Sequence, residues 1–219
     1  MRLNKYVALA TGLSRRKADE LISLGRVQVN NTIPTMGEAI TDQIVTLDDE
    51  KLTIPKTTQT IMLHKPVGYI CSRDGQGSPT IYELIPEALH NLKPVGRLDK
   101  NSSGLLLLTN DGDLAQQLTH PSHHKVKQYL VHINKPLEPL HRQMISDIGI
   151  QLEDGPSKLQ LERIHDNTDK DWRVVMSEGR NRQIRRTFES LGYFVAKLHR
   201  THFGSYELGT LQPGKHKTV

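Results

Sequence analysis

The stretch Gly96-Arg97-Leu98-Asp99-Lys100-Asn101-Ser102-Ser103-Gly104 runs directly into four leucines, Leu105 to Leu108. A short apolar run of this kind indicates a strand that is buried on both faces. The loop before it holds one carboxylate, Asp99, between two cations. Loops anchored to a rigid strand often carry binding or catalytic groups, and a carboxylate beside cations tends to stay ionised, as a nucleophile must. These residues are also ordinary turn formers, so on their own they fit a plain turn equally well.

The composition favours a polyanionic partner. The chain of 219 residues has 29 Lys and Arg against 24 Asp and Glu, a net charge of +5, and its pI is about 9.3. This length suits one medium domain, or a small and a medium one. The only cysteine, Cys71, lies in a strand-like context that predicts a buried thiol rather than a nucleophile, and a chain without disulfides suits the cytoplasm. No apolar run approaches the roughly 18 residues of a membrane span, and no signal-type apolar segment follows the first residues.

The first fifty residues predict a small module of their own. Apolar residues at helical spacing, with a glycine where each pattern stops, predict helices at about 3–12 and 14–25. Alternating valines at 27–29 lead into Asn30-Asn31, a hairpin-type turn, and residues 44–47 predict a closing strand. The polar, proline-containing stretch 51–60 suits a short, semi-extended linker.

The second of these helices begins with three cations, Arg15, Arg16 and Lys17. Cations in a first turn oppose the helix dipole at a cost on the order of 0.3–1 kcal/mol each. An external phosphate backbone would compensate for that cost. The simpler alternative is a charged face that is only solvated.

From about residue 60 the chain alternates strand-like and helix-like segments. Strands are predicted at 61–64, 105–108, 129–133, 172–176 and 194–199, and helices at 113–118, 140–148 and 184–191, the first of them capped by Asp113. Runs of strands between helices predict an α+β domain on a largely antiparallel sheet.

A second cluster of charge falls near the end of the chain. Arg180, Arg182, Arg185 and Arg186 lie within seven residues, and the acids Glu178 and Glu189 cannot neutralise all four. Three of the arginines are three or four residues apart and would repel each other on one helix face, so an anion is expected there. The planar guanidinium suits phosphate because it binds two oxygens at once.

The motifs Gly-Arg-Leu-Asp at 96–99, Ser-Gly-Leu-Leu at 103–106 and Thr-Asn-Asp-Gly at 109–112 resemble the signature of the RsuA/RluB family of bacterial rRNA pseudouridine synthases. The first fifty residues resemble the small RNA-binding module of ribosomal protein S-four type. The resemblance implies an RNA-binding module with its linker at 1–57 and a pseudouridine synthase domain at 58–219, on a mostly antiparallel mixed sheet. It implies no cofactor and no metal.

The resemblance also implies site residues. Asp99 matches the catalytic aspartate, Tyr129 the active-site tyrosine and Arg185 the basic residue that pairs with the aspartate. The substrate pocket would include Arg97, Gln183 and Leu198. RNA contacts would come from the basic residues of both modules, namely Arg2, Lys5, Arg15, Arg16, Lys17, Arg26, Arg180, Arg182 and Arg186.

The implied reaction breaks the bond between ribose and the uracil ring nitrogen, rotates the base and rejoins it through carbon five. The target base must first be flipped out of its stack. Asp99 would add to the sugar or the base, or remove a ribose proton, and the sequence leaves these routes open. Tyr129 would stack on the base and assist proton removal from carbon five, although a half-buried strand tyrosine is the plainer interpretation.

Two other groups of side chains have simpler roles than catalysis or metal binding. His120, His123 and His124 lack a carboxylate or thiolate at metal-ligand spacing, so RNA contacts are expected of them rather than a metal site. Asp111 and Asp113 suit turn and cap roles better than a glycosidase-type carboxylate pair.

The expected partner is ribosomal RNA or a ribosome assembly intermediate, bound by a monomer. The motifs at 99–112 are closer to the large-subunit branch of the family. A small-subunit synthase is one alternative, and a non-catalytic rRNA-binding or assembly protein is the other. A pure binding protein needs the arginines but has no need of an aspartate among them.

Overall fold

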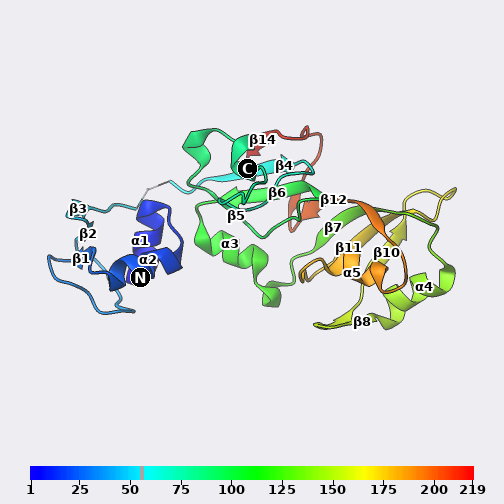
Figure 1. Cartoon of the computed structure of the whole chain (residues 1–219), viewed down its shortest axis with the longest axis horizontal. Coiled ribbons are helices and arrows are strands. Elements are labelled where there is room, and N and C mark those ends of the chain that lie inside the picture. Colours follow the sequence, from blue (N-terminus) through cyan, green and yellow to red (C-terminus); the bar gives the residue numbers. More distant parts are fainter. Residues whose placement is uncertain (55–56) are drawn as a thin grey trace. The chain divides into compact units, whose positions relative to one another are not determined.

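The structure is a computed structural model that describes residues 1–54 and 57–219 (Figure 1). The chain divides into two compact units, Met1–Gln59 and Thr60–Val219, and each unit has its own hydrophobic core. Within the described residues, no helix is both long and apolar enough to cross a membrane.

The first unit packs two helices against a small sheet. Its elements are α1 (Leu3–Thr11), α2 (Arg15–Ser23), β1 (Val27–Val29), β2 (Val45–Leu47) and β3 (Glu50–Lys51), and the strands form an antiparallel sheet in the order β1-β2-β3. Gly12 ends α1 in the left-handed region, and the Ser14 hydroxyl accepts a hydrogen bond from the Lys17 amide to cap α2. Both helices and the turn at Asn30-Asn31, where both residues have positive φ, are confirmed.

The linker prediction was too long. Lys51 lies in β3, Leu52 packs on the core of the first unit, and Thr60 already belongs to the sheet of the second unit. Part of the predicted linker, residues 55–56, lies outside the described residues. A polar composition concealed Leu52, whose backbone amide also bonds to the carbonyl of Val45.

The second unit is built on a nine-stranded sheet. Its central path runs β10-β11-β7-β12-β6-β4-β14, with β5 paired to β6 and β13 to β12. The strands are β4 (Thr60–Lys65), β5 (Lys93–Pro94), β6 (Ser103–Thr109), β7 (Lys127–Ile133), β10 (Gln160–Arg163), β11 (Asp171–Met176), β12 (Val195–Phe203), β13 (Tyr206–Glu207) and β14 (His216–Thr218). Among the described strands only β12 and β6 run parallel, so the predicted mostly antiparallel α+β fold is confirmed.

Helices and a hairpin cover this sheet (Figure 1). They are α3 (Gly112–Thr119), α4 (Pro139–Gln143) with the π-helix η4 (Met144–Ile148), α5 (Gln183–Glu189), the hairpin β8 (Ile150–Leu152) and β9 (Gly155–Ser157), and the 3-10 turns η1 (Ile81–Leu84), η2 (Glu87–Leu89) and η3 (Pro121–His123).

Strand β6 is buried on both faces, as its four leucines predict. None of the four is exposed. Leu106 and Leu108 belong to the main core with β7, β11 and α5, whereas Leu105 and Leu107 pack on the opposite face in a smaller cluster. The loop that carries Asp99 therefore leads into the most deeply buried strand of the unit, which gives that loop a rigid base.

Two local predictions were wrong. Asp111, not Asp113, caps α3, because its carboxylate accepts the amides of Asp113 and Leu114. Cys71 lies in a bend rather than a strand, half buried beside Leu98. The helix predicted at 140–148 is confirmed as α4 and η4, but its apolar stripe is only partly buried, with Met144 packed on the core.

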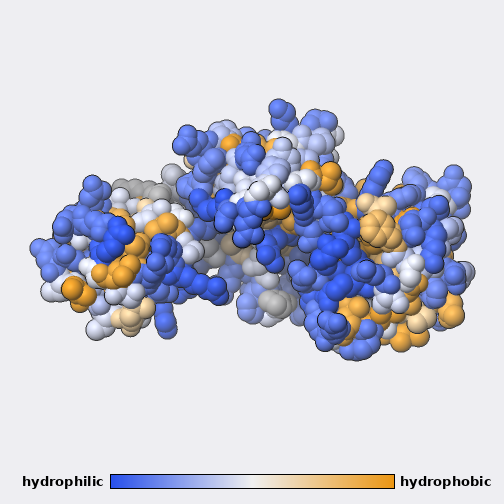
Figure 2. Space-filling view, viewed as in Figure 1, coloured by the Kyte–Doolittle hydropathy of each residue, from blue (hydrophilic) through white to orange (hydrophobic). Residues whose placement is uncertain are grey.

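In that helix the chain winds into a π-turn, with the Gly149 amide bonding to the Met144 carbonyl, and this rotates the face that is buried. Ile145 is buried, but Leu140 and Ile148 are 63% and 74% exposed. Figure 2 shows apolar surface gathered over this part of the molecule.

Candidate active site

The Asp99 loop is fixed from beneath by a buried lysine. Lys65 ends β4 with no exposed surface, and its ammonium donates to the carbonyls of Pro66, Asp99 and Ser102 at 3.0, 3.0 and 2.7 Å. Burial lowers the pKa of Lys65 to about 8. A further bond of 3.0 Å from the Ser102 amide to the Asp99 carbonyl closes the turn. The backbone of Asp99 is therefore held in one place while its carboxylate remains partly exposed.

Arg185 lies behind this carboxylate and is 6% exposed. Its guanidinium donates to the carbonyls of Val195 at 2.6 Å and Asn101 at 2.8 Å, and to the Ser102 hydroxyl at 3.3 Å. Its Nε is 4.0 Å from Asp99 Oδ2 and makes no hydrogen bond. Burial lowers the pKa of Arg185, and the positive charge of Arg182 adds to that effect. The pairing of Asp99 with Arg185 is thus a close electrostatic contact from a rigidly held cation.

Arg182 lies near the same oxygen of Asp99 as Arg185 does. It begins α5 in the left-handed conformation, and its NH1 lies 3.5 Å from Asp99 Oδ2. Its side chain is 44% exposed. Asp99 therefore has one buried and one exposed arginine beside it.

The structure does not show the repulsion expected between Arg182, Arg185 and Arg186 on one helix face. Arg186 turns away from Asp99 and pairs with Asp154 at 2.6 Å, and Arg180 pairs with the same carboxylate at 2.8 Å. The Arg186 guanidinium holds the pKa of Asp154 below its usual range. Asp154 lies in the β8–β9 hairpin, more than twenty residues before the arginines, so sequence spacing could not identify it as their partner.

A pocket of about 460 Å³ opens over Asp99. The predicted site residues that line it are Arg97, Asp99, Tyr129, Arg180, Arg182, Gln183 and Leu198. Tyr129 on β7 and Leu198 on β12 are each 8% exposed, and they come from neighbouring strands of the sheet. Arg185 and Arg186 do not line the pocket, and Arg185 Nε lies 4.0 Å from Asp99 Oδ2.

The side chain of Gln183 links several residues of the pocket wall through hydrogen bonds. Its amide donates to the Ser157 hydroxyl at 3.1 Å and to the Glu178 carboxylate, and its oxygen accepts the Arg180 amide at 3.1 Å. Its side chain is fully engaged and 2% exposed. Gln183 thus shapes the pocket by holding the loop at 178–180.

Three cations of this site were missed by sequence reasoning, namely Lys65, Lys127 and Arg200. Each is at least partly buried at the end of or within a strand, and Lys127 and Arg200 line the pocket. The sequence feature that could have identified them is a lysine or arginine at a strand position where the apolar pattern predicts a buried side chain. For Lys65 that pattern is the run Ile61 to Leu63, all of it buried.

The basic residues of the first unit lie at its surface, several with internal partners. Arg15 donates to Asn4 at 3.1 Å, Lys17 pairs with Glu20 at 2.7 Å, and Arg26 forms a two-pronged pair with Asp48. Arg2 and Arg16 are exposed, and Lys5 is half buried. The first turn of α2 holds no acid, so the unfavourable placement of its three cations is confirmed.

The histidines near 120 are adjacent to the pocket. His120 lines it and bonds through Nδ1 to the Ser122 hydroxyl at 2.7 Å. In residues 1–54 and 57–219 no cluster of three His, Cys, Asp or Glu side chains has an arrangement that would hold a metal ion.

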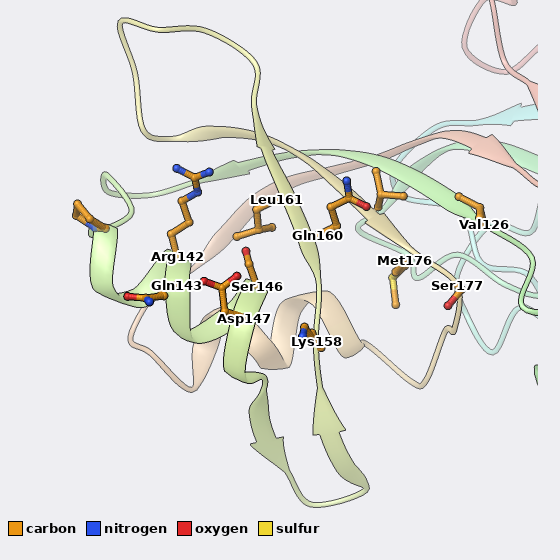
Figure 3. Close-up of a pocket in the computed structure, with 12 residues that line it drawn as sticks. Val126, Arg142, Gln143, Ser146, Asp147, Lys158, Gln160, Leu161, Met176 and Ser177 are labelled. Atoms are coloured by element: carbon orange, nitrogen blue, oxygen red, sulfur yellow. The ribbon is translucent and has the colours of Figure 1, made fainter.

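A second pocket, of about 670 Å³, lies between α4–η4 and the strands β10 and β11 (Figure 3). It shares Met176 and Ser177 with the pocket over Asp99, and its one lining carboxylate is Asp147. None of the predicted site residues lines it. The predicted constellation therefore belongs to the pocket over Asp99.

Comparison with known proteins assigns the two units of the chain to two different families. A family model described as RNA pseudouridylate synthase matches residues 59–190, and one described as S4 domain matches residues 1–35. The chain belongs to the RNA pseudouridylate synthase family.

Individual relatives differ in length. The chain is 38% identical to a ribosomal large subunit pseudouridine synthase B of Xylella fastidiosa, over 93% of this chain and 45% of that protein. It is 37% identical to a ribosomal small subunit pseudouridine synthase A of Pasteurella multocida, over 100% of this chain and 96% of that protein. The chain thus spans about half the length of the first relative and nearly all of the second.

A crystal structure of a pseudouridylate synthase superposes with a TM-score of 0.73 and 34% identity, over 100% of this chain and 96% of that one. The resemblance and the fold class predicted from the sequence are confirmed by these matches.

Proposed function

We propose that this protein is an isomerase that converts a uridine of ribosomal RNA, in the large subunit, to pseudouridine. The observation that carries the proposal is the position of the Asp99 carboxylate, which faces a pocket lined by Tyr129 and has Arg185 at its back. A binding protein would have no need of a carboxylate in a pocket that is otherwise rich in arginine.

In this proposal the target uridine leaves its stack and enters the pocket, where Leu198 and Tyr129 contact the base. Asp99 acts on the ribose or the base, and the bond between ribose C1′ and N1 breaks. The base rotates, a bond from C1′ to C5 forms, the proton on C5 leaves and N1 gains a proton. Tyr129 assists the removal of the C5 proton. The reaction is a net isomerisation and uses no cofactor.

The two arginines have different tasks. Arg185 is fixed by backbone carbonyls and holds its charge beside Asp99 throughout the reaction. Arg182 is exposed and close to the same oxygen, so it can move to an RNA phosphate when the substrate arrives. Residues 1–57 act as the RNA-binding module and residues 58–219 as the catalytic domain of a cytoplasmic, monomeric enzyme whose substrate is rRNA or an assembly intermediate.

A second candidate substrate is small-subunit rRNA. Its support is the 37% identity to the small-subunit enzyme of Pasteurella multocida, which is nearly the same as the 38% identity to the large-subunit enzyme of Xylella fastidiosa. The names of most of the similar relatives favour the large subunit.

The test is release of tritium from rRNA that carries uridine labelled at carbon five, with large-subunit and small-subunit rRNA as separate substrates. Wild type is expected to release tritium from the large-subunit rRNA. Asp99→Asn should abolish release and leave RNA affinity nearly intact, because only the charge of one carboxylate is removed. Asp147→Asn, in the second pocket, is the matched control and should retain activity. Normal turnover by Asp99→Asn would refute the assignment, and tight binding without release by wild type would indicate an assembly protein.

A further inference from the structure

Two cations share the part of the pocket beyond Tyr129. In the pairing of β7 with β12, Arg200 lies directly opposite Tyr129 and Phe203 directly opposite Lys127, with a bulge between Arg200 and His202. Residues opposite each other in an antiparallel pair project to the same face. All four side chains line the pocket. The sheet therefore sets Lys127 and Arg200 side by side at one end of it.

Arg200 is a buried charge without a carboxylate. It is 3% exposed, its Nε donates to the Leu105 carbonyl at 2.8 Å, and its guanidinium lies 4.9 Å from the centre of the Phe203 ring. Its NH2 group is buried and has no hydrogen-bond partner. A buried cation left unpaired is costly unless an anion comes close to it.

Lys127 is the accessible member of the pair. Its ammonium donates to the carbonyls of Lys125 and Glu178, both at 3.2 Å, and lies 5.3 Å from the centre of the Phe203 ring. Two neutral acceptors leave one of the three ammonium protons for a ligand. Burial lowers the pKa of Lys127, and the charge of Arg200 lowers it further.

The acids of the pocket have closer partners than this pair, although the charge of Glu178 reaches Lys127 and opposes the lowering of its pKa. Asp99 and Glu178 are the two carboxylates among the lining residues. Asp99 faces Arg182 and Arg185, and Glu178 accepts a hydrogen bond from Gln183 and lies 3.5 Å from Arg180. The end of the pocket at Lys127 therefore keeps an excess of positive charge.

We propose that Lys127 and Arg200 bind a phosphodiester group of the substrate RNA, next to the nucleotide whose base enters the pocket. This inference rests on the proposed function for the identity of the RNA. From Leu198 to Arg200 the strand advances about 7 Å, a distance that one nucleotide spans. The base and ribose lie at the Asp99 end, where the reaction takes place, and this phosphate lies at the other end. Lys127 donates directly, while Arg200 attracts the anion from beneath.

The test uses a seven-nucleotide RNA with one central uridine among adenosines, and the same RNA with each phosphate in turn replaced by an uncharged methylphosphonate. Binding is followed by fluorescence anisotropy. Wild type should lose affinity by about tenfold at one linkage beside the uridine. Lys127→Gln should bind the unmodified RNA about tenfold more weakly and show no further loss at that linkage. Lys127→Arg should restore the sensitivity.

Lys217→Gln, an exposed lysine on β14, is the control for the loss of one positive charge and should behave as wild type. Equal losses from the methylphosphonate in wild type and Lys127→Gln would overturn the proposal, as would the absence of any sensitive linkage beside the uridine. Tryptophan fluorescence, which reports on the buried Trp172, confirms that each variant is folded.

The two proposals fail in different ways. If wild type shows the coupling between Lys127 and one phosphate but makes no pseudouridine in either rRNA, the phosphate site stands and the isomerase assignment falls. If tritium is released but no linkage depends on Lys127, the enzyme stands and the phosphate lies elsewhere.

Discussion

The ammonium of Lys65 lies 3.0 Å from the backbone carbonyl oxygen of Asp99, so a fully buried cation fixes the residue that we propose as the nucleophile. Burial of the ammonium removes it from water, and this desolvation lowers the pKa of Lys65 to about 8. In return three carbonyls of the loop converge on one donor group. Lys65 acts through the backbone, and the Asp99 carboxylate remains available to a substrate.

Replacement of Lys65 by methionine should lower pseudouridine formation by about 100-fold, because a loop displaced by an ångström loses the reacting geometry. It should also change the pH dependence of stability. The pKa of Lys65 is about 8 in the folded protein and near 10.5 when unfolded. Between these values the unfolded state binds more protons, so the free energy of unfolding of wild type rises with pH, by an amount on the order of 3 kcal/mol. Lys65→Met should lack this rise.

Urea unfolding at pH 7 and pH 10, followed by the fluorescence of the single tryptophan, Trp172, measures the stability of the second unit. Lys217→Met is the exposed control and should keep the rise of wild type. An identical pH dependence in wild type and Lys65→Met would show that Lys65 does not titrate in this range.

The predicted site residues lie together in the structure because each is part of a local sequence pattern. The loop before Leu105, the strand around Tyr129 and the helix with Arg185 each have a short sequence pattern, and the structure places Asp99 and Tyr129 in one pocket with Arg185 at its back. The fold class followed from the order of strands and helices, and it is confirmed. The roles of these residues remain predictions until Asp99→Asn is measured.

The parts that could not be predicted depend on contacts between distant segments. Asp154 forms ion pairs with Arg180 and Arg186. It lies in a hairpin whose position depends on the fold and cannot be read from the spacing of residues in the sequence. Lys65 reaches the Asp99 loop across the pairing of β4 with β6. The π-turn after Gln143 rotates a helix face that a regular 3.6-residue period would bury. In each case tertiary structure overrides the local pattern.

Gly104→Ala should strongly destabilise the second unit. Gly104 has a φ of 110°, and a Cβ there would lie 2.2 Å from the Arg200 carbonyl oxygen, where β6 and β12 run in parallel. Neither backbone can withdraw without breaking the sheet, so we expect a loss of more than about 3 kcal/mol in the free energy of unfolding.

Gly112→Ala is the matched control. It lies at the start of α3 with nothing within 4 Å of a Cβ, and it should be neutral or stabilise by about 0.5 kcal/mol. Equal stabilities of the two variants in urea would contradict this account.

The combined change of Arg15, Arg16 and Lys17 to alanine should weaken binding to rRNA and flatten its salt dependence. These cations crowd the first turn of α2, which itself holds no acid, although Lys17 pairs with Glu20 in the next turn; phosphates of the RNA would offset this unfavourable placement. The slope of log affinity against log salt should fall by about one for each lost phosphate contact. Filter binding between 50 and 300 mM salt measures it, and Lys215→Ala with Lys217→Ala, in the second unit, serves as a control for lost charge. The variant should be about as stable as wild type, because relief of the helix dipole offsets the loss of the exposed Lys17–Glu20 pair and of the Arg15–Asn4 hydrogen bond. An unchanged slope would mean that these residues form only a solvated face, and that the first unit binds RNA through Arg2, Lys5 or Arg26 instead.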